Sequence, residues 1–151
     1  MTRSRLPAAA LVLAVVLPTS AAAQAPAVVG RVKVSTGTTA IVRGGQALPA
    51  PIGAEVAEAD LLRTGADGRL AVMLRDETRL ALGPGSEVAV ASFAFAPSDG
   101  RLGLTLRLAR GVLSYVSGLV ARLSPASVSI QTPTSVIGVR GTHALIRAGA
   151  R

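Results

Sequence analysis

The stretch LLRTGADGRLAVMLRDETRLAL, residues 61–82, decides which fold this chain should adopt. Every second residue of this stretch is apolar or Thr in two runs, which are separated by a break at Asp76-Glu77. They are Leu70, Val72 and Leu74 in the first run and Thr78, Leu80 and Leu82 in the second. Because side chains of equal parity point to one face of a strand, the stretch predicts a hairpin with one buried side.

Similar alternating runs lie on both sides of this stretch. Strands are predicted at residues 28–35, 38–43, 86–95, 102–108, 111–117, 127–131, 135–139 and 142–146. Pro49, Pro51 and Gly53 predict an irregular connection, because proline cannot donate to a β-ladder. We therefore expect an all-β domain of about ten short strands, either a β-sandwich or a twisted, solenoid-like stack.

A helix over residues 102–123 is the main competing interpretation, since leucine and arginine are good helix formers. Three glycines, Gly103, Gly111 and Gly118, would each cost about 1 kcal/mol inside such a helix. The leucines also recur every second residue rather than every third or fourth. These features favour strands.

The N-terminus has the pattern of an export signal. Arg3 and Arg5 precede an apolar core at residues 6–17, and the small residues Ser20 to Ala23 follow it. An uncleaved membrane anchor would need about 20 apolar residues, more than this core provides. We expect cleavage after Ala23, which makes residues 1–23 a signal peptide, 24–27 a linker and 28–151 one periplasmic or secreted domain. No later apolar run exceeds ten residues, so the sequence does not predict an integral membrane protein.

The chain contains no cysteine, which excludes disulfides, thiolate metal sites and cysteine nucleophiles. Phe93, Phe95 and Tyr115 are its only aromatic residues, so the core should be aliphatic.

Charge is unevenly distributed. All eight acidic residues lie between Glu55 and Asp99, and seven arginines follow Asp99 without a single acid. Nucleic-acid binding is a poor explanation for this excess of arginine. An exported chain does not meet nucleic acid, and with almost no aromatic residues it has few side chains that could stack on bases. An acidic protein partner, an anionic envelope surface or a merely solvated basic face remains.

Catalytic and metal-binding patterns are not found. His143 is the only histidine and has no acid near it in the sequence. Asp76 and Glu77 are adjacent and would point to opposite faces of a strand, so a turn explains them better than a carboxylate pair. No calcium loop, phosphate loop or GxSxG motif is present. We expect neither enzymatic activity nor a cofactor.

Four segments in a fixed order resemble the FecR-domain family of bacterial envelope proteins. They are GRVKV (residues 30–34), the stretch from Thr64 to Ser86 (TGADGRLAVMLRDETRLALGPGS), GVL (111–113) and TPTSVIGVRGT (132–142). The resemblance covers residues 29–146 and implies an extracytoplasmic, twisted all-β module. In the founding members this module belongs to transmembrane regulators of sigma factors that respond to an outer-membrane transporter.

The chain departs from that plan in two ways. An export signal stands where those regulators have a cytoplasmic anti-sigma segment and a membrane helix, so we expect the exported domain but not the sigma-regulator role to carry over. Family members also usually continue for two strands beyond the RGT motif. If those strands are missing here, residues 142–146 would form an unpaired apolar edge, and we predict homo-oligomerisation.

The TPTSVIGVRGT segment supplies the candidate binding residues Thr132, Pro133, Gly138, Arg140, Gly141 and Thr142. Gly138 and Gly141 also suit bulges or turns, and Arg140 suits either an anion or an internal carboxylate. We expect a non-enzymatic domain that contacts another envelope protein through a strand edge or an arginine-lined face. The alternative is a module that binds an anionic glycan or lipid headgroup.

Overall fold

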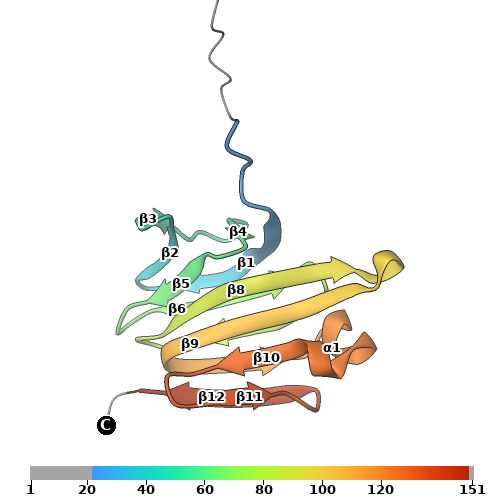
Figure 1. Ribbon diagram of the computed structural model, residues 1–151. Helices are drawn as coiled ribbons and strands as arrows, with labels where there is room; N and C mark the ends of the chain where they lie inside the picture. The colour runs from blue at the N-terminus through green and yellow to red at the C-terminus, as the bar shows by residue number, and fades with distance from the viewer. Residues whose placement is uncertain (1–21, 150–151) are drawn as a thin grey trace, which may run out of the picture.

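The computed structural model describes residues 22–149, so all but the end of the predicted signal peptide lies outside the described residues. The all-β prediction is confirmed: the chain forms one open, curled sheet (Figure 1). Its strands are β1 (Val28–Thr36), β2 (Thr39–Arg43), β3 (Gln46–Pro49), β4 (Glu55–Ala57), β5 (Leu61–Thr64), β6 (Arg69–Leu74), β7 (Arg79–Leu82), β8 (Glu87–Ala96), β9 (Arg101–Val116), β10 (Val128–Gln131), β11 (Val136–Gly138) and β12 (His143–Ala148).

The sheet runs in the order β3-β2-β5-β8-β9-β7-β6-β1-β4, and its neighbours along this path are antiparallel. The long strand β9 joins its two halves. Residues 101–110 pair with β8, whereas residues 113–116 pair with β7. On its other edge β9 pairs first with β10 and then with β12. The β9–β10 pairing is the only parallel one among residues 22–149.

The hairpin predicted from residues 61–82 is confirmed for β6 and β7, which pair from Leu70 with Leu82 to Met73 with Arg79. The residues predicted to share one face are all buried: Leu70, Val72, Leu74, Thr78, Leu80 and Leu82. β5 instead crosses to the other half of the sheet, where it lies between β2 and β8. The core enclosed by the curled sheet is aliphatic, as expected, with Tyr115 as its one fully buried aromatic residue.

Several elements differ from the expectation. The chain is irregular at Pro51 and Gly53, as predicted, but this connection is flanked by two short strands that were not predicted, β3 and β4. Pro49 ends the edge strand β3, where its missing donor costs nothing. The strands expected at 102–108 and 111–117 are one continuous strand. After it comes a one-turn helix, α1 (Leu119–Leu123), and two 3-10 turns, η1 (Pro97–Asp99) and η2 (Pro125–Ser127), flank the region.

No helix within residues 22–149 is both long and apolar enough to cross a bilayer.

Candidate binding surface

The outer side of one half of the sheet is formed by β1, β6, β7, the end of β9 and β12, and we call it the basic face. Its strands bury alternate residues, so the intervening side chains point outward. The outward residues are Lys33, Val34, Arg69, Ala71, Met73, Arg79, Ala81, Val112, Ser114, Val116, His143, Leu145 and Arg147.

Strand register arranges these side chains in rows across the strands. The middle row is almost entirely apolar and runs Val34, Ala71, Ala81, Ser114, Leu145. Its two ends stand clear of the sheet, since Val34 is 48% and Leu145 70% exposed. An antiparallel sheet usually presents polar side chains on its solvated face. An exposed apolar row rimmed by polar groups is instead typical of a contact surface.

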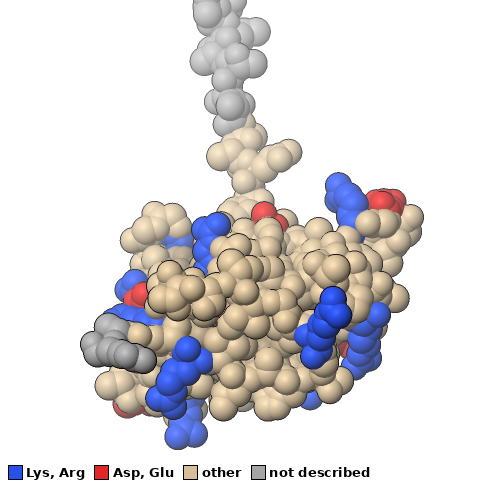
Figure 2. All heavy atoms as spheres, turned by 60° about the horizontal axis from the view of Figure 1, so that its bottom comes forward, with Lys and Arg blue, Asp and Glu red and all other residues tan. Residues whose placement is uncertain are grey.

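Unpaired cations surround this row. None of the five strand segments contains an acidic residue. Lys33, Arg69, Arg79 and Arg147 are exposed and take part in none of the four ion pairs found within residues 22–149. Arg31, at the β4 side of the face, is bonded to Glu55 at 2.7 Å. Basic side chains also outnumber acidic ones on the side of the molecule seen in Figure 2.

On the other half of the sheet, two outward arginines are ion-paired. Glu87 on β8 lies 3.0 Å from Arg63 on β5 and 2.7 Å from Arg110 on β9, so one carboxylate serves two neighbouring guanidinium groups. Arg107 on β9 donates to the amide oxygen of Gln131 at 3.0 Å. On this half Glu87 therefore neutralises two outward arginines, whereas none of the four exposed cations of the basic face is ion-paired within the described residues.

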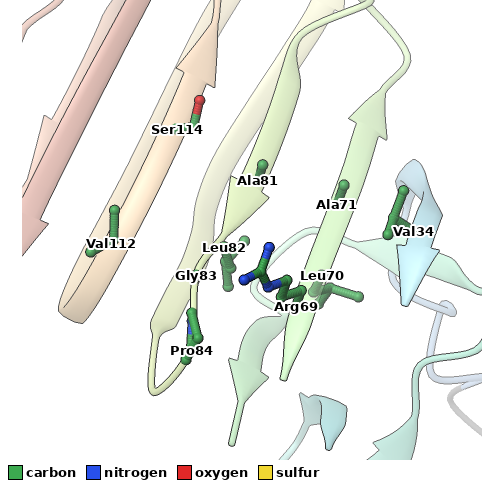
Figure 3. Close-up of a pocket in the computed structure, with 10 residues that line it drawn as sticks. All are labelled: Val34, Arg69, Leu70, Ala71, Ala81, Leu82, Gly83, Pro84, Val112 and Ser114. Atoms are coloured by element: carbon green, nitrogen blue, oxygen red, sulfur yellow. The ribbon is translucent and has the colours of Figure 1, made fainter. Parts of the chain in front are cut away.

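A shallow depression of about 330 Å³ lies over β7 in the basic face (Figure 3). Its floor is low because Ala71, Ala81 and Gly83 have small side chains or none, while Val34 and Arg69 border it. A second hollow of about 240 Å³ shares Ala71, Ala81 and Ser114 with the first and extends toward Lys33 and Arg79. The two form one apolar trough along the hairpin, with cations at its margins.

Ser114 and His143 meet at the border of this trough. Ser114 Oγ lies 2.9 Å from His143 Nε2, and both side chains are at the surface. No carboxylate among residues 22–149 is hydrogen-bonded to the imidazole, so the pair lacks the third group that orients a catalytic histidine. No group of three or more His, Cys, Asp or Glu side chains that could hold a metal ion occurs in the described part of the chain.

The candidate residues taken from TPTSVIGVRGT lie at the two ends of the short strand β11. Thr132 and Pro133 belong to the turn before it, which is closed by a hydrogen bond from Thr132 N to Ser135 O at 2.8 Å. Gly138 is the last residue of β11 and pairs with Ser129. These three residues therefore shape the β10–β11 hairpin.

The remaining candidates, Arg140, Gly141 and Thr142, lie in the connection to β12. Arg140 is exposed, and Gly141 has a φ of 131°. Ser117 fastens this connection, because its side chain donates to Gly141 O and its amide to Thr142 O. Arg140 and Gly141 border a hollow next to Pro125, away from Thr132 and Pro133. The motif thus does not gather into a single site, and the residues of the basic face were not among those predicted.

The strand β12 is also an edge. It pairs with β9 on one side, and no strand within residues 22–149 pairs with its other side. Its exposed leucine, Leu145, is also one end of the apolar row of the basic face.

Comparison with known proteins adds a family assignment. A family model described as "FecR protein" matches residues 60–151, which include β5 to β12 and most of the basic face. A search of curated proteins found no match. A search of solved structures found none either.

Proposed function

We propose, because this chain belongs to the FecR protein family, that it is a non-enzymatic binding domain of the bacterial envelope. The family indicates a signalling or regulatory role there. In the proposal residues 1–23 direct export, and the domain acts in the periplasm or outside the cell. Its basic face binds an acidic region of another envelope protein.

One observation carries this proposal: four cations in none of the ion pairs of residues 22–149 surround an exposed apolar row on strand segments without acids. Protein interfaces combine an apolar centre with a polar rim, and arginine is enriched in them. Exposed cations of one sign also steer an oppositely charged partner toward the surface. On the other half of the sheet, by contrast, Glu87 pairs with two outward arginines.

The geometry around His143 supports a non-catalytic role in this proposal. Its contact with Ser114 lies on an exposed sheet face, and no acid within residues 22–149 orients the ring. A hydrolytic Ser–His pair needs such an orienting group and donors for a developing oxyanion.

An anionic glycan or lipid headgroup is the second candidate ligand, since the same four cations would attract its phosphates or carboxylates. The basic face has no aromatic side chain on which a sugar could stack. Its apolar row also gains nothing from a purely ionic ligand. These two features favour a protein.

The test is crosslinking capture of envelope proteins by the full chain, exported by its own host. We expect the variant Arg69→Glu/Arg79→Glu to lose the captured partner, because it reverses two rim charges. The matched control, Arg101→Glu/Arg122→Glu, changes two exposed arginines outside the basic face and should capture normally.

Equal capture by both double variants would overturn the proposal. Binding to phosphatidylglycerol vesicles or to an anionic glycan, lost steeply between about 0.05 and 0.5 M salt while protein capture is absent, would favour the second candidate instead.

A further inference from the structure

We infer that the trough over β7 receives an amphipathic helix whose apolar side is flanked by carboxylates. The inference names the kind of partner segment that the basic face binds, and so it rests on the proposed function. It depends on three features of the face: the shape of its floor, the position of its cations and the state of its backbone.

The floor has the width of a helix. From β1 to β12 there are four strand spacings, about 19 Å in all. Val34 and Leu145 project at the two sides, and the residues between them in the middle row are Ala71, Ala81 and Ser114. A helix with its side chains is about 10–12 Å across, so it fits between the projecting residues when it lies along the strands.

The cations stand at the ends and at the sides of the trough that such a helix would occupy. Arg69 comes two residues before Ala71 on β6, and Arg79 two residues before Ala81 on β7, each displacement being about 7 Å along the strand. Because β6 and β7 are antiparallel, the two arginines lie at opposite ends of the trough. Lys33 and Arg147 lie at its sides, on β1 and β12. Carboxylates on both flanks of a helix would each have a cation within reach.

The backbone of the trough floor offers no free edge to which an extended peptide could add as a strand. β6 is hydrogen-bonded between β1 and β7, and β7 between β6 and β9. No main-chain donors or acceptors of these two strands are free to pair with an added strand. A helix satisfies its own backbone groups and needs only side-chain contacts, so it can lie on such a surface without losing hydrogen bonds.

Charge also decides against a second copy of this chain. Two basic faces brought together would oppose Lys33, Arg69, Arg79 and Arg147 with the same residues and no acid from any of the five strand segments. Juxtaposed like charges in an interface oppose association. The occupant must therefore carry the acids itself.

The experiment uses a synthetic peptide of about four helical turns with leucine and alanine on one side and glutamate along both flanks of that side. The control peptide has the same composition in scrambled order. Binding to the full chain is measured by fluorescence anisotropy, and the contact residues by nuclear magnetic resonance shifts. We expect the amphipathic peptide to bind at least about tenfold more tightly than the scrambled one and to shift the signals of Ala71, Ala81 and Val112.

Two variants separate shape from charge. Ala81→Phe fills the trough and leaves every cation in place, so it should weaken peptide binding by about tenfold or more. Ala89→Phe, on the outer side of the other half of the sheet, should leave it unchanged. Equal binding of both peptides, or full binding by Ala81→Phe, would overturn the inference. Vesicle binding that survives Ala81→Phe while the peptide fails to bind would overturn it as well and assign the face to lipid.

The outcome also separates this inference from the proposed function. If capture of an envelope protein depends on Arg69 and Arg79 but not on filling the trough, the proposed function stands and the helix does not.

Discussion

Two acidic residues show how single side chains shape this domain from within. Asp60 is buried and accepts from Arg43 Nε at 2.8 Å, Arg43 Nη2 at 2.7 Å and Ala57 N at 2.7 Å. Asp76 is also buried, and its carboxylate accepts from Thr78 N and Thr78 Oγ1 and from Val120 N at 3.1 Å. A turn at Asp76 could be predicted, but its burial could not, because one partner comes from 44 residues further along the chain.

Gly111 is the residue on which the bend of β9 depends. Its φ is 91°, and a Cβ atom at this position would lie 2.4 Å from Ser86 Cα. We therefore expect Gly111→Ala to reduce the free energy of unfolding by about 3 kcal/mol, since it combines backbone strain with a clash against main chain. Urea denaturation followed by circular dichroism measures the change.

The matched control lies in the same strand. A Cβ atom added at Gly103 would meet no atom of the described residues within 4 Å, and Gly103 has no positive φ. Gly103→Ala should therefore change stability by less than about 1 kcal/mol. Similar losses in the two variants would show that the conformation of Gly111 is not what bends the strand.

The ionisation of Tyr115 can be followed without interference from other tyrosines, because it is the only tyrosine in the chain. Burial raises the pKa of Tyr115 above its ordinary value of about 10, since the phenolate would lie in the core. The folded domain thus keeps the proton longer than the unfolded chain does. The stability associated with this group is complete below about pH 10 and is lost as the pH rises above that value.

Absorbance of tyrosinate near about 295 nm should therefore increase only at a pH above about 10, together with the loss of the far-ultraviolet β signal. Tyr115→Phe should abolish the absorbance change. Ionisation at the ordinary pKa with the fold intact would contradict the burial of this side chain.

At the scale of the elements, alternation located nearly every strand that has one buried side. β6, β7, β8 and β9 were predicted because their inward residues recur at period two. β3 and β4 have four and three residues, too few for a period to show. The helix α1 could not be predicted from propensity, because contacts of its first amides with Asp76 fix its position.

The binding surface was harder to predict than the strands. Arg69 and Arg79 were visible as outward residues of the hairpin, and an arginine-lined face was expected. The sequence does not show which arginines remain unpaired, because pairing depends on neighbours in the sheet. Arg63 has the same alternation as Arg79, but it meets Glu87, which lies on a strand distant in the sequence and also pairs with Arg110.

The edge strand β12 carries a prediction about association. Its outward edge has no partner within residues 22–149, and Leu145 is 70% exposed. Exposed, unprotected edges pair with one another. We expect reversible, concentration-dependent dimers in size-exclusion chromatography coupled to light scattering.

Leu145→Lys should shift this equilibrium to the monomer, because a charge on an edge strand opposes pairing. Leu123→Lys on α1, where the side chain is 58% exposed and lies on no strand edge, is the control for added charge alone. A strictly monomeric native chain at high concentration would contradict the prediction.

At the scale of the whole molecule, several acidic side chains make internal contacts or ion pairs, whereas many basic side chains in the described part of the chain are exposed and unpaired. Asp60 and Asp76 hold the interior, and Glu55 and Glu87 neutralise arginines on and beside the sheet. The 16 Lys and Arg exceed the 8 Asp and Glu, which leaves a formal net charge of +8. Four cations without an ion pair among residues 22–149 lie together on five strand segments that contain no acid. The fold therefore brings onto one face four cations that come from distant parts of the sequence.

This arrangement predicts opposite effects of one substitution on stability and on binding. Like charges held on one face repel one another in the folded domain and much less in the unfolded chain, so they should reduce stability. Arg79→Glu removes one repelling charge and adds an attractive one. We expect the thermal midpoint at low salt to rise by about 1–2 °C, while binding of an acidic partner is lost. In the native chain, salt at about 0.15 M should raise the midpoint by screening the same repulsion. Circular dichroism melts of both proteins at two salt concentrations measure this. A lower midpoint for Arg79→Glu at low salt would mean that this arginine stabilises the fold, and its place on the face would then need no binding partner to explain it.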